Sequence, residues 1–321
     1  MKRIGVITSG GDAPGMNACV RAVVRTALSL ELEVYGIRRG YSGLIDGDME
    51  MLTARDVGGI VQRGGTFLQT ARSKEFMTPE GRRKAVRRMN DRRIDGLVII
   101  GGNGSLAGAY ELHKMGVPVL GVPGSIDNDV PCTDMSIGVD TALNTMVNII
   151  DMIKDTASSH QRCFLVQVMG RHHGYLALIG GIIGGAEVTV IPEKELTLEE
   201  IAGAVEQAYI RGKTHAIIVV AEGAKTSAQE IADYLHEIEA GFEVRVTVLG
   251  HVQRGGSPSA FDRLLATRMG VQAAQALAAG EVGKMTALVG NKLKLVDLEK
   301  VISQEPELDQ TTYELAEMLA R

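Results

Sequence analysis

The chain has 321 residues, of which 45% are apolar and 23% charged, a composition typical of a globular protein with one large core or two smaller ones. Its formal net charge of -5 at pH 7 argues against a nucleic-acid binder, so any phosphate site must be local. No segment approaches the roughly 20 apolar residues that a membrane-spanning helix needs, and no membrane partner is expected.

The first predicted elements are a strand over residues 3–8, a glycine-rich turn over 9–17 and a helix over 18–30. Apolar residues recur along one face of that helix, while Arg21 and Arg25 share the other face. The turn places backbone N–H groups and a helix N-terminus where an anionic phosphate could bind. It matches neither a Rossmann fingerprint nor a P-loop, so alone it is a weak signal.

The same order of apolar run and polar loop returns later in the chain. Further strands are predicted at 97–100, 117–122, 164–168, 216–220 and 244–249. Such strands, separated by helical segments, predict an α/β fold with a mostly parallel sheet covered on both faces. Ligands bind outside the carboxyl ends of these strands, which makes the loops candidates for a site. A domain boundary is expected near Gly138, before a helix over 141–155, and a last short helix over 313–321.

Two of the predicted loops carry residue types suited to phosphoryl transfer. Gly102 and Gly104 would let a nucleotide approach the backbone closely, and Ser105 adds a hydroxyl, although an Asn-Gly pair also forms tight turns on its own. Asp127 and Asp129 follow a strand two residues apart, so one carboxylate could serve a metal and the other a substrate hydroxyl. A simple Asx-turn cluster is the alternative.

Arginines in or beside the predicted loops are a second candidate feature. They are Arg72, Arg162, Arg171, Arg245 and Arg254. Their guanidinium groups suit bidentate phosphate contacts, and His251 could add a further hydrogen bond. Each of these residues alone is more often structural or exposed, but their placement at successive strand ends favours a shared role.

Cysteine usage and the N-terminus bear on the cellular compartment. Cys19, Cys132 and Cys163 are widely spaced and form no CxxC pattern, which indicates neither a disulfide framework nor a thiolate zinc site. The first apolar run, from Ile4 to Thr8, is too short for a signal peptide. A reducing cytoplasm is therefore the expected location.

Five motifs occur in a characteristic order. They are Gly-Gly-Asp-Ala-Pro-Gly-Met-Asn at 10–17, Arg-Gly-Gly-Thr at 63–66, Pro-Gly-Ser-Ile-Asp-Asn-Asp at 123–129, Met-Gly-Arg at 169–171 and Gly-His-Val-Gln-Arg-Gly-Gly-Ser-Pro at 250–258. In order and spacing they resemble the phosphofructokinase family, specifically its bacterial ATP-dependent members, over nearly the whole chain. The resemblance implies two similar Rossmann-like domains with mostly parallel sheets, an active site in the cleft between them, and a homotetramer.

The resemblance also implies the reaction and the domain roles. The γ-phosphoryl group of ATP would pass to the 1-hydroxyl of fructose 6-phosphate, giving fructose 1,6-bisphosphate in glycolysis. Residues 1–138 and about 251–300 would form the nucleotide-binding domain. Residues 139–250 and about 301–321 would form the sugar-phosphate-binding domain.

Roles are implied for each residue that matches the family motifs. The nucleotide site would comprise Gly11, Arg72, Ser73, Gly102, Asn103, Gly104 and Ser105. The sugar phosphate would contact Ser125, Ile126, Asp127, Met169, Gly170, Arg171, Glu222, His251 and Arg254, with Arg162 and Arg245 supplied by a neighbouring subunit. The catalytic set would be Asp127 as general base with Arg171, Ser125, Gly11 and Arg72, and Mg²⁺ would be served by Asn103 and Asp129.

An effector site for ADP or phosphoenolpyruvate, between subunits, is implied as well. Its residues would be Arg21, Arg25, Lys154, Gly185, Glu187, Arg211 and Lys213. The chain departs from the family at Ala54, where an arginine is common, and Lys154 replaces another arginine. Fewer bidentate anion contacts predict a shallower response to effectors.

One departure lies in the nucleotide site, and two alternative functions stay open. Asn103 stands where the family usually has an aspartate serving Mg²⁺, which predicts weaker metal binding. A pyrophosphate-dependent phosphofructokinase typically has aspartate and lysine at positions 104 and 124, so Gly104 and Gly124 favour ATP. A non-catalytic sugar-phosphate or nucleotide sensor is disfavoured by Asp127 and Arg171.

Overall fold

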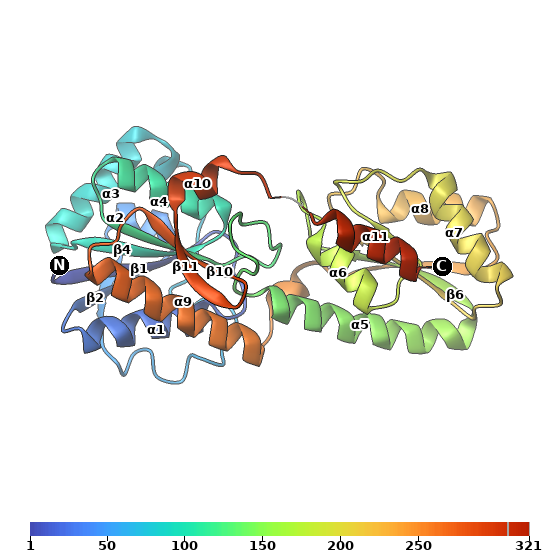
Figure 1. Cartoon of the computed structure of the whole chain (residues 1–321), viewed down its shortest axis with the longest axis horizontal. Coiled ribbons are helices and arrows are strands. Elements are labelled where there is room, and N and C mark those ends of the chain that lie inside the picture. The colour runs from blue at the N-terminus through green and yellow to red at the C-terminus, as the bar shows by residue number, and fades with distance from the viewer. Residues whose placement is uncertain (307, 321) are drawn as a thin grey trace. The chain divides into compact units, whose positions relative to one another are not determined.

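A computed structural model of the chain describes residues 1–306 and 308–320 and divides into two compact units (Figure 1). Unit 1 comprises residues 1–141 and 254–306, and unit 2 comprises residues 142–253 and the C-terminal segment after Pro306. The chain passes between the units within helix α5 (Val139–His160) and within the 3₁₀ turn η2 (Gly250–Arg254). These crossings lie a few residues from the expected boundaries, and the binding role of each unit stays a prediction.

Unit 1 is built on a seven-stranded sheet in the order β11-β10-β5-β4-β1-β2-β3. Its strands are β1 (Arg3–Ser9), β2 (Glu33–Ile37), β3 (Met49–Leu52), β4 (Gly96–Gly101), β5 (Val119–Pro123), β10 (Lys284–Val289) and β11 (Lys292–Asp297). Neighbouring strands are parallel except at the two edges, where β3 and β11 run antiparallel. The central strands are buried along nearly their whole length because helices cover both faces.

Two helices, α1 (Met16–Ser29) and α9 (Ala260–Ala278), lie together on one face of this sheet, and other helical elements cover the other face (Figure 1). These other elements are α2 (Gly40–Asp46), the 3₁₀ turn η1 (Glu75–Met77), α3 (Pro79–Arg92), α4 (Asn103–Lys114) and α10 (Leu298–Ser303). Gly270 of α9 faces α1 so closely that a Cβ there would lie 2.8 Å from the carbonyl oxygen of Cys19. Helix α1 corresponds to the helix expected over residues 18–30 and begins two residues earlier.

Unit 2 has a four-stranded parallel sheet in the order β7-β8-β6-β9. Its strands are β6 (Arg162–Val168), β7 (Val188–Val190), β8 (Ala216–Ala221) and β9 (Glu243–Val248). Its helices are α6 (Tyr175–Ile183), α7 (Leu198–Ile210), α8 (Ala228–Glu237) and α11 (Gln310–Leu319), with most of α5. Apolar residues of α7 and α8 form one core with the sheet, while α6 packs on Thr189 of β7 and on Met146 of α5.

The α/β architecture with mostly parallel sheets confirms the fold class predicted from the sequence. The expected last helix corresponds to α11, and position 321, which the prediction included, lies outside the described residues. Within the described part of the chain, every helix is too short or too polar to cross a membrane.

Candidate functional site

Three loops of unit 1 meet because the carboxyl ends of β1, β4 and β5 are in register. Ser9 pairs with Gly101, and Gly101 pairs with Pro123, so the loops that follow these residues begin side by side. They carry the predicted residues at positions 11, 102–105 and 125–129. The structure thus brings the two halves of the predicted phosphoryl-transfer site, the glycine loops and the aspartate loop, to one sheet edge.

The Gly11 turn lies directly against Arg254, which the sequence places far away in the chain. Arg254 Nη1 donates to the carbonyl oxygen of Asp12 at 3.0 Å. A Cβ on Gly11 would lie 2.4 Å from the same nitrogen. Glycine is therefore required at position 11 as long as the guanidinium occupies this place, and the pairing puts a fixed cation beside a turn suited to phosphate.

Helix α4 begins two residues after β4 ends, so its N-terminus lies at the sheet edge where the three loops begin. Its N-cap is Gly102, and no side chain of the described residues caps it. Ser105 N–H already donates to the Gly102 carbonyl oxygen at 2.9 Å, so the N–H groups of Asn103 and Gly104 and the positive end of the helix dipole are the groups that an anion could meet. Gly104 is exposed and has open space around its Cβ position, whereas Ser105 is buried beneath the turn.

A hydrogen-bond network joins α4 to the aspartate loop after β5. Asn103 Nδ2 donates to the Asp129 carbonyl oxygen at 2.8 Å and to its carboxylate Oδ2 at 3.0 Å. Ser125 Oγ donates to Asp129 Oδ1 at 2.9 Å, and it accepts from the backbone N–H of Asp127 at 3.3 Å. All four residues are half-buried, and Oδ1 of Asp127 is itself fully buried.

The loop that carries Arg72 and Ser73 is tied to the same helix through an aromatic pair. Ser73 Oγ accepts from the backbone N–H of Phe76 at 3.2 Å, and the Phe76 ring stacks on Tyr41 with centroids 3.9 Å apart. Tyr41 donates to the carbonyl oxygen of Ser105 at 2.5 Å. Burial raises the pKa of Tyr41, which keeps its hydroxyl a donor. Tyr41 and Phe76 were not among the predicted site residues, because their aromatic character alone indicates only a place in the core.

Unit 2 brings together a second set of predicted residues at the carboxyl ends of β6 and β8. Backbone bonds join the two ends, from Glu222 N–H to the carbonyl oxygen of Val168 at 2.8 Å and from Gly223 N–H to that of Gly170 at 3.1 Å. Gly170 has φ 128°, a conformation that favours glycine. The motif at residues 169–171 therefore lies against Glu222, and the side chains of Arg171 and Glu222 are both exposed.

The end of β9 lies next to this motif through a buried residue that sequence reasoning did not select. Gln253 of η2 is fully buried, accepts from the backbone N–H of Met169 at 3.4 Å and donates to the carbonyl oxygen of Gly250 at 3.1 Å. The same turn presents His251, which is exposed. Gln253 belongs to the quoted motif at 250–258, so its position was visible although its role was not.

Two further residues that were not predicted, His173 and Glu193, hold the backbone that follows Arg171. His173 is buried and its Nδ1 lies 2.9 Å from Glu193 Oε1, while Gly174 N–H donates to the same carboxylate at 2.8 Å. Burial opposes the ionised form, but these hydrogen bonds hold the pKa of Glu193 below its ordinary value. The carboxylate thus fixes the backbone immediately after Arg171.

Arg162 and Arg245 lie at the other end of the unit 2 strands. Arg162 begins β6, seven residues before Met169, and Arg245 pairs in register with Phe164. At about 3.3 Å per residue, this separation from the 169–171 motif is on the order of 20 Å. Both arginines pair with Glu243. One chain does not bring them to the other sugar-site residues, and their expected role in a neighbouring subunit's site stays a prediction.

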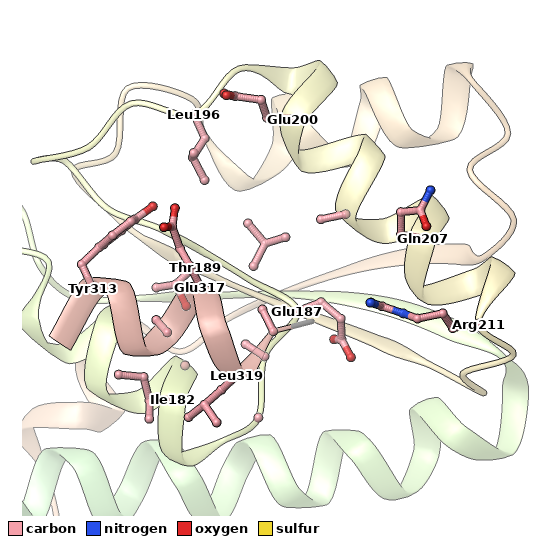
Figure 2. Close-up of a pocket in the computed structure, with 17 residues that line it drawn as sticks. Ile182, Glu187, Thr189, Leu196, Glu200, Gln207, Arg211, Tyr313, Glu317 and Leu319 are labelled. Atoms are coloured by element: carbon pink, nitrogen blue, oxygen red, sulfur yellow. The ribbon is translucent and has the colours of Figure 1, made fainter. Parts of the chain in front are cut away.

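The unit 2 members of the predicted effector set lie close together, and Figure 2 shows two of them, Glu187 and Arg211, beside one pocket. Lys213 Nζ lies 3.0 Å from Oε1 of Glu187, a buried carboxylate, and a Cβ at Gly185 would lie 3.1 Å from Lys154 Nζ. Arg211, at the end of α7, points its guanidinium toward the interior of the pocket in Figure 2 and forms no ion pair within the described chain. The other two members, Arg21 and Arg25, lie on α1 of unit 1.

A cavity of about 400 Å³ adjoins this cluster and was not predicted. Residues of α6, β7, α7 and α11 line it, and side chains such as Ile182, Leu196 and Leu319 make its walls largely apolar. Tyr313 and Glu317 of α11 lie on its rim, where both contact Lys194. The volume is at the small end of the range for ligand pockets.

The whole chain is similar to known proteins. The family model described as Phosphofructokinase matches residues 3–277. A protein of Thermotoga neapolitana named ATP-dependent 6-phosphofructokinase is 54% identical over 321 residues, which cover 100% of both chains. A protein of Bacillus pumilus with the same name is 51% identical over 320 residues, again covering 100% of each.

Solved structures show the same likeness. The phosphofructokinase of Saccharomyces cerevisiae is 38% identical with a TM-score of 0.88, and the match covers 94% of this chain but 45% of the yeast chain, so this chain spans less than half of that protein. A pyrophosphate-dependent phosphofructokinase from Marinobacter aquaeolei has a TM-score of 0.88 at 22% identity, over 100% of this chain and 92% of the other. At that identity the likeness concerns the fold alone.

Proposed function

We propose that this chain, which belongs to the phosphofructokinase family, transfers the γ-phosphoryl group of ATP to the 1-hydroxyl of fructose 6-phosphate. Relatives named for the ATP-dependent enzyme align over its full length and support this activity. The observation that carries the proposal is the loop after β5, where Asp127 and Asp129 stand beside the open N-terminus of α4.

The nucleotide is proposed to bind at the sheet edge of unit 1. Its phosphates would meet the N–H groups at the start of α4 and the Gly11 turn, with the exposed Arg72 as a cation. Two glycines support ATP over pyrophosphate. Gly104 leaves open space beside the turn, and a Cβ at Gly124 would already lie 3.1 Å from Met16 Cε, so a lysine there would displace the core side chain.

The sugar phosphate is proposed to bind at the strand ends of unit 2. Arg171 and His251 offer charged and polar contacts to phosphate, and Glu222 would accept hydrogen bonds from sugar hydroxyls. All three side chains are exposed while the backbone beneath them is fixed by Gln253 and Glu193. This arrangement favours orientation of a polar ligand by side chains on a rigid support.

Asp127 is proposed as the general base. It would accept the proton of the 1-hydroxyl as that oxygen attacks the γ-phosphorus in line with the leaving group. Arg171 would offset negative charge on the transferring group, and the N-terminus of α4 would stabilise the charge left on the nucleotide. Ser125, bonded to the backbone of Asp127 and the carboxylate of Asp129, would keep the base in place.

The residues around Asp129 suit Mg²⁺ in the form in which it accompanies a nucleotide. Within residues 1–306 and 308–320, no three His, Cys, Asp or Glu side chains gather to bind a metal by themselves. Mg²⁺ is usually held by one or two carboxylates together with substrate phosphates and waters, so the Asp129 carboxylate fits that role, while Asn103, whose Nδ2 donates to Asp129, would serve the ion by holding that carboxylate. When bound, the ion would neutralise charge on the β- and γ-phosphates.

A coupled assay with purified protein tests the proposed function. Fructose 6-phosphate is offered with ATP or with pyrophosphate at several Mg²⁺ concentrations, and fructose 1,6-bisphosphate is measured. We expect turnover with ATP and at least about 100-fold less with pyrophosphate, in line with a site built for one donor. Preference for pyrophosphate would identify the pyrophosphate-dependent activity, and binding of both ligands without turnover would identify a sensor.

Assembly, regulation and location are proposed from the same family membership. A homotetramer would allow Arg162 and Arg245 to serve a neighbouring subunit, in agreement with their distance from the other sugar-site residues. ADP or phosphoenolpyruvate would act at the cluster of Lys154, Glu187, Arg211 and Lys213. A cytoplasmic location agrees with the burial of Cys19 and Cys163, since burial raises the pKa of Cys163 to about 12 and leaves its thiol inert.

A further inference from the structure

The carboxamide of Asn103 bridges two elements that a site for a metal nucleotide must hold together. Asn103 opens helix α4, and Asp129 lies two residues after Asp127 in the loop that follows β5. Asn103 Nδ2 reaches both the carbonyl oxygen of Asp129, at 2.8 Å, and its carboxylate Oδ2, at 3.0 Å. Ser125 Oγ bonds the other carboxylate oxygen at 2.9 Å. Both oxygens of this carboxylate therefore accept from neutral donors.

The orientation of the amide follows from chemistry. A carbonyl oxygen and an ionised carboxylate can only accept hydrogen bonds, so the NH₂ group of Asn103 must face Asp129. An oxygen in its place would face two acceptors at about 3 Å and leave all of them without a proton to share. The residue is thus used as a donor, and its remaining oxygen faces away from the carboxylate.

We propose that Asn103 is a positioning residue that does by hydrogen bonding what a bound cation would otherwise do. It holds the Asp129 carboxylate against the start of α4, so that this part of the site is assembled without metal and receives Mg²⁺ only together with the nucleotide. The second half of this statement rests on the proposed function, whereas the first half does not depend on it.

The consequence of an aspartate at position 103 supplies the contrast. A carboxylate there would stand about 3 Å from the Asp129 carboxylate and its carbonyl oxygen, and like charges this close disfavour each other strongly. A divalent cation would relieve the repulsion, because Mg²⁺ prefers hard anionic oxygen ligands. Replacing the NH₂ group of Asn103 by oxygen should therefore make the contact between residue 103 and Asp129 depend on a bound metal ion.

The test compares wild-type protein with Asn103→Asp, in the absence of nucleotide and sugar. Binding of Mn²⁺ is followed by water proton relaxation, and thermal unfolding is recorded in EDTA and in Mg²⁺. We expect Asn103→Asp to bind Mn²⁺ at least about 10-fold more tightly than wild type, as a second carboxylate joins the site. Its Tm should fall in EDTA and recover in Mg²⁺, while the wild-type Tm stays the same in both.

Two further variants separate charge from the loss of a contact. Asn103→Ala removes the hydrogen bonds without adding charge, so its Tm should fall in EDTA and not respond to Mg²⁺. The exchanged pair Asn103→Asp with Asp129→Asn restores one donor facing one carboxylate, so it should regain most of the Tm lost in EDTA and lose the tight Mn²⁺ binding.

Two results would overturn the proposal. One is wild-type protein that binds Mn²⁺ as tightly as Asn103→Asp without nucleotide. The other is an Asn103→Asp protein whose Tm in EDTA equals that of wild type. The proposed function fails separately, because it requires turnover of the wild-type protein with ATP, which none of these substrate-free measurements records.

Discussion

The loops of unit 1 and those of unit 2 are built in different ways, although both lie at the carboxyl ends of parallel strands. In unit 1 the predicted side chains bond to one another, as in the network of Asn103, Ser125 and Asp129. In unit 2 the side chains of Arg171, Glu222 and His251 are exposed. The buried Gln253 and the partly exposed Glu193 bond the backbone that carries them. In unit 1 the residues proposed to act on the ligand also hold their own loops in place. In unit 2 different residues carry out these two roles.

This difference has a clear physical meaning. A loop that positions phosphates and a base within tenths of an ångström profits from bonding its own functional groups together. A loop that grips a polar sugar profits from side chains that are free to close around it. The comparison predicts that substitutions in unit 1 affect turnover first, whereas substitutions of the supporting residues in unit 2 affect substrate affinity first.

The largest expected effect is that of Asp127→Ser in unit 1. Turnover should fall by roughly 10²–10⁴-fold, the usual result of losing a positioned base, while affinity for fructose 6-phosphate stays close to normal. Steady-state kinetics and binding of the sugar phosphate measured by calorimetry check this expectation. Near-normal turnover would remove Asp127 from the role of base and weaken the contrast between the units.

Gln253→Leu should have the next largest effect and the opposite kinetic signature. The substitution leaves Met169 N–H and the carbonyl oxygen of Gly250 without their partner, which costs about 1–3 kcal/mol for buried groups. Because the 169–171 motif loosens, KM for fructose 6-phosphate should rise on the order of tenfold, with KM for ATP little changed.

A matched control for that variant is available in the same unit. Gln229 lies exposed on α8 and bonds Asp233 at 2.8 Å, so Gln229→Leu makes the same chemical change on the surface. It should leave both KM values and the Tm nearly unchanged. If Gln253→Leu raised KM for both substrates equally, support in unit 2 would not be separate from the nucleotide site.

A smaller effect is expected from Glu193→Gln, and it should depend on pH. The folded-state pKa of Glu193 lies below the ordinary value of 4.5, so its contribution to stability is present above that value and is lost as the pH falls through the folded pKa. The variant should unfold more easily than wild type at pH 7, and the gap should close at acid pH.

Denaturant unfolding of both proteins between pH 3 and pH 7 measures that gap, in a range chosen about the ordinary carboxyl pKa. Glutamine has nearly the same shape as glutamate and still forms hydrogen bonds, so the packing is unchanged. The comparison therefore measures the effect of the negative charge of Glu193. A gap that is constant over the whole range would show that the ionised state of Glu193 does not support the stretch after Arg171.

The smallest effect is expected at the amino end of the unit 2 sheet, with Arg211→Ala. ADP and phosphoenolpyruvate should shift the midpoint of wild-type fructose 6-phosphate saturation, and the shift should shrink in the variant because a free guanidinium is lost from the cluster. Saturation curves with and without each effector decide the question. An unchanged shift would place effector binding elsewhere, and no shift in wild type would end the regulatory assignment.

Much of the fold was predictable because central parallel strands are continuous apolar runs followed by polar or glycine-rich loops. The strands at 97–100 and 216–220 were found for this reason. The strands β7, of three residues, and β11, which alternates charged and apolar residues, lack that signal. The crossing between units lies inside α5, a few residues after the boundary expected near Gly138, because the helix continues through the crossing without a break.

The candidate site was predictable only where chemistry is visible in residue type. Asp127, Arg171 and the glycine turns follow strands and carry groups suited to phosphate, so the sequence indicates them directly. Gln253 and Tyr41 act by bonding backbone atoms that come from distant parts of the chain. A single buried glutamine or tyrosine has no periodicity or spacing, so only the folded structure shows what it holds.

The Asn103-Gly104 step is also a place where the protein can change chemically over time, by deamidation of the asparagine. Asparagine followed by glycine is prone to lose its side-chain ammonia over time, which leaves aspartate or isoaspartate and a mass increase of about 1 Da. The bonds from Asn103 Nδ2 to Asp129 and the helical backbone slow this change as long as the site is folded. An old preparation would thus contain molecules with asparagine and molecules with aspartate at position 103, which bind Mg²⁺ differently. Its apparent Mg²⁺ requirement would therefore depend on how long the protein had been stored.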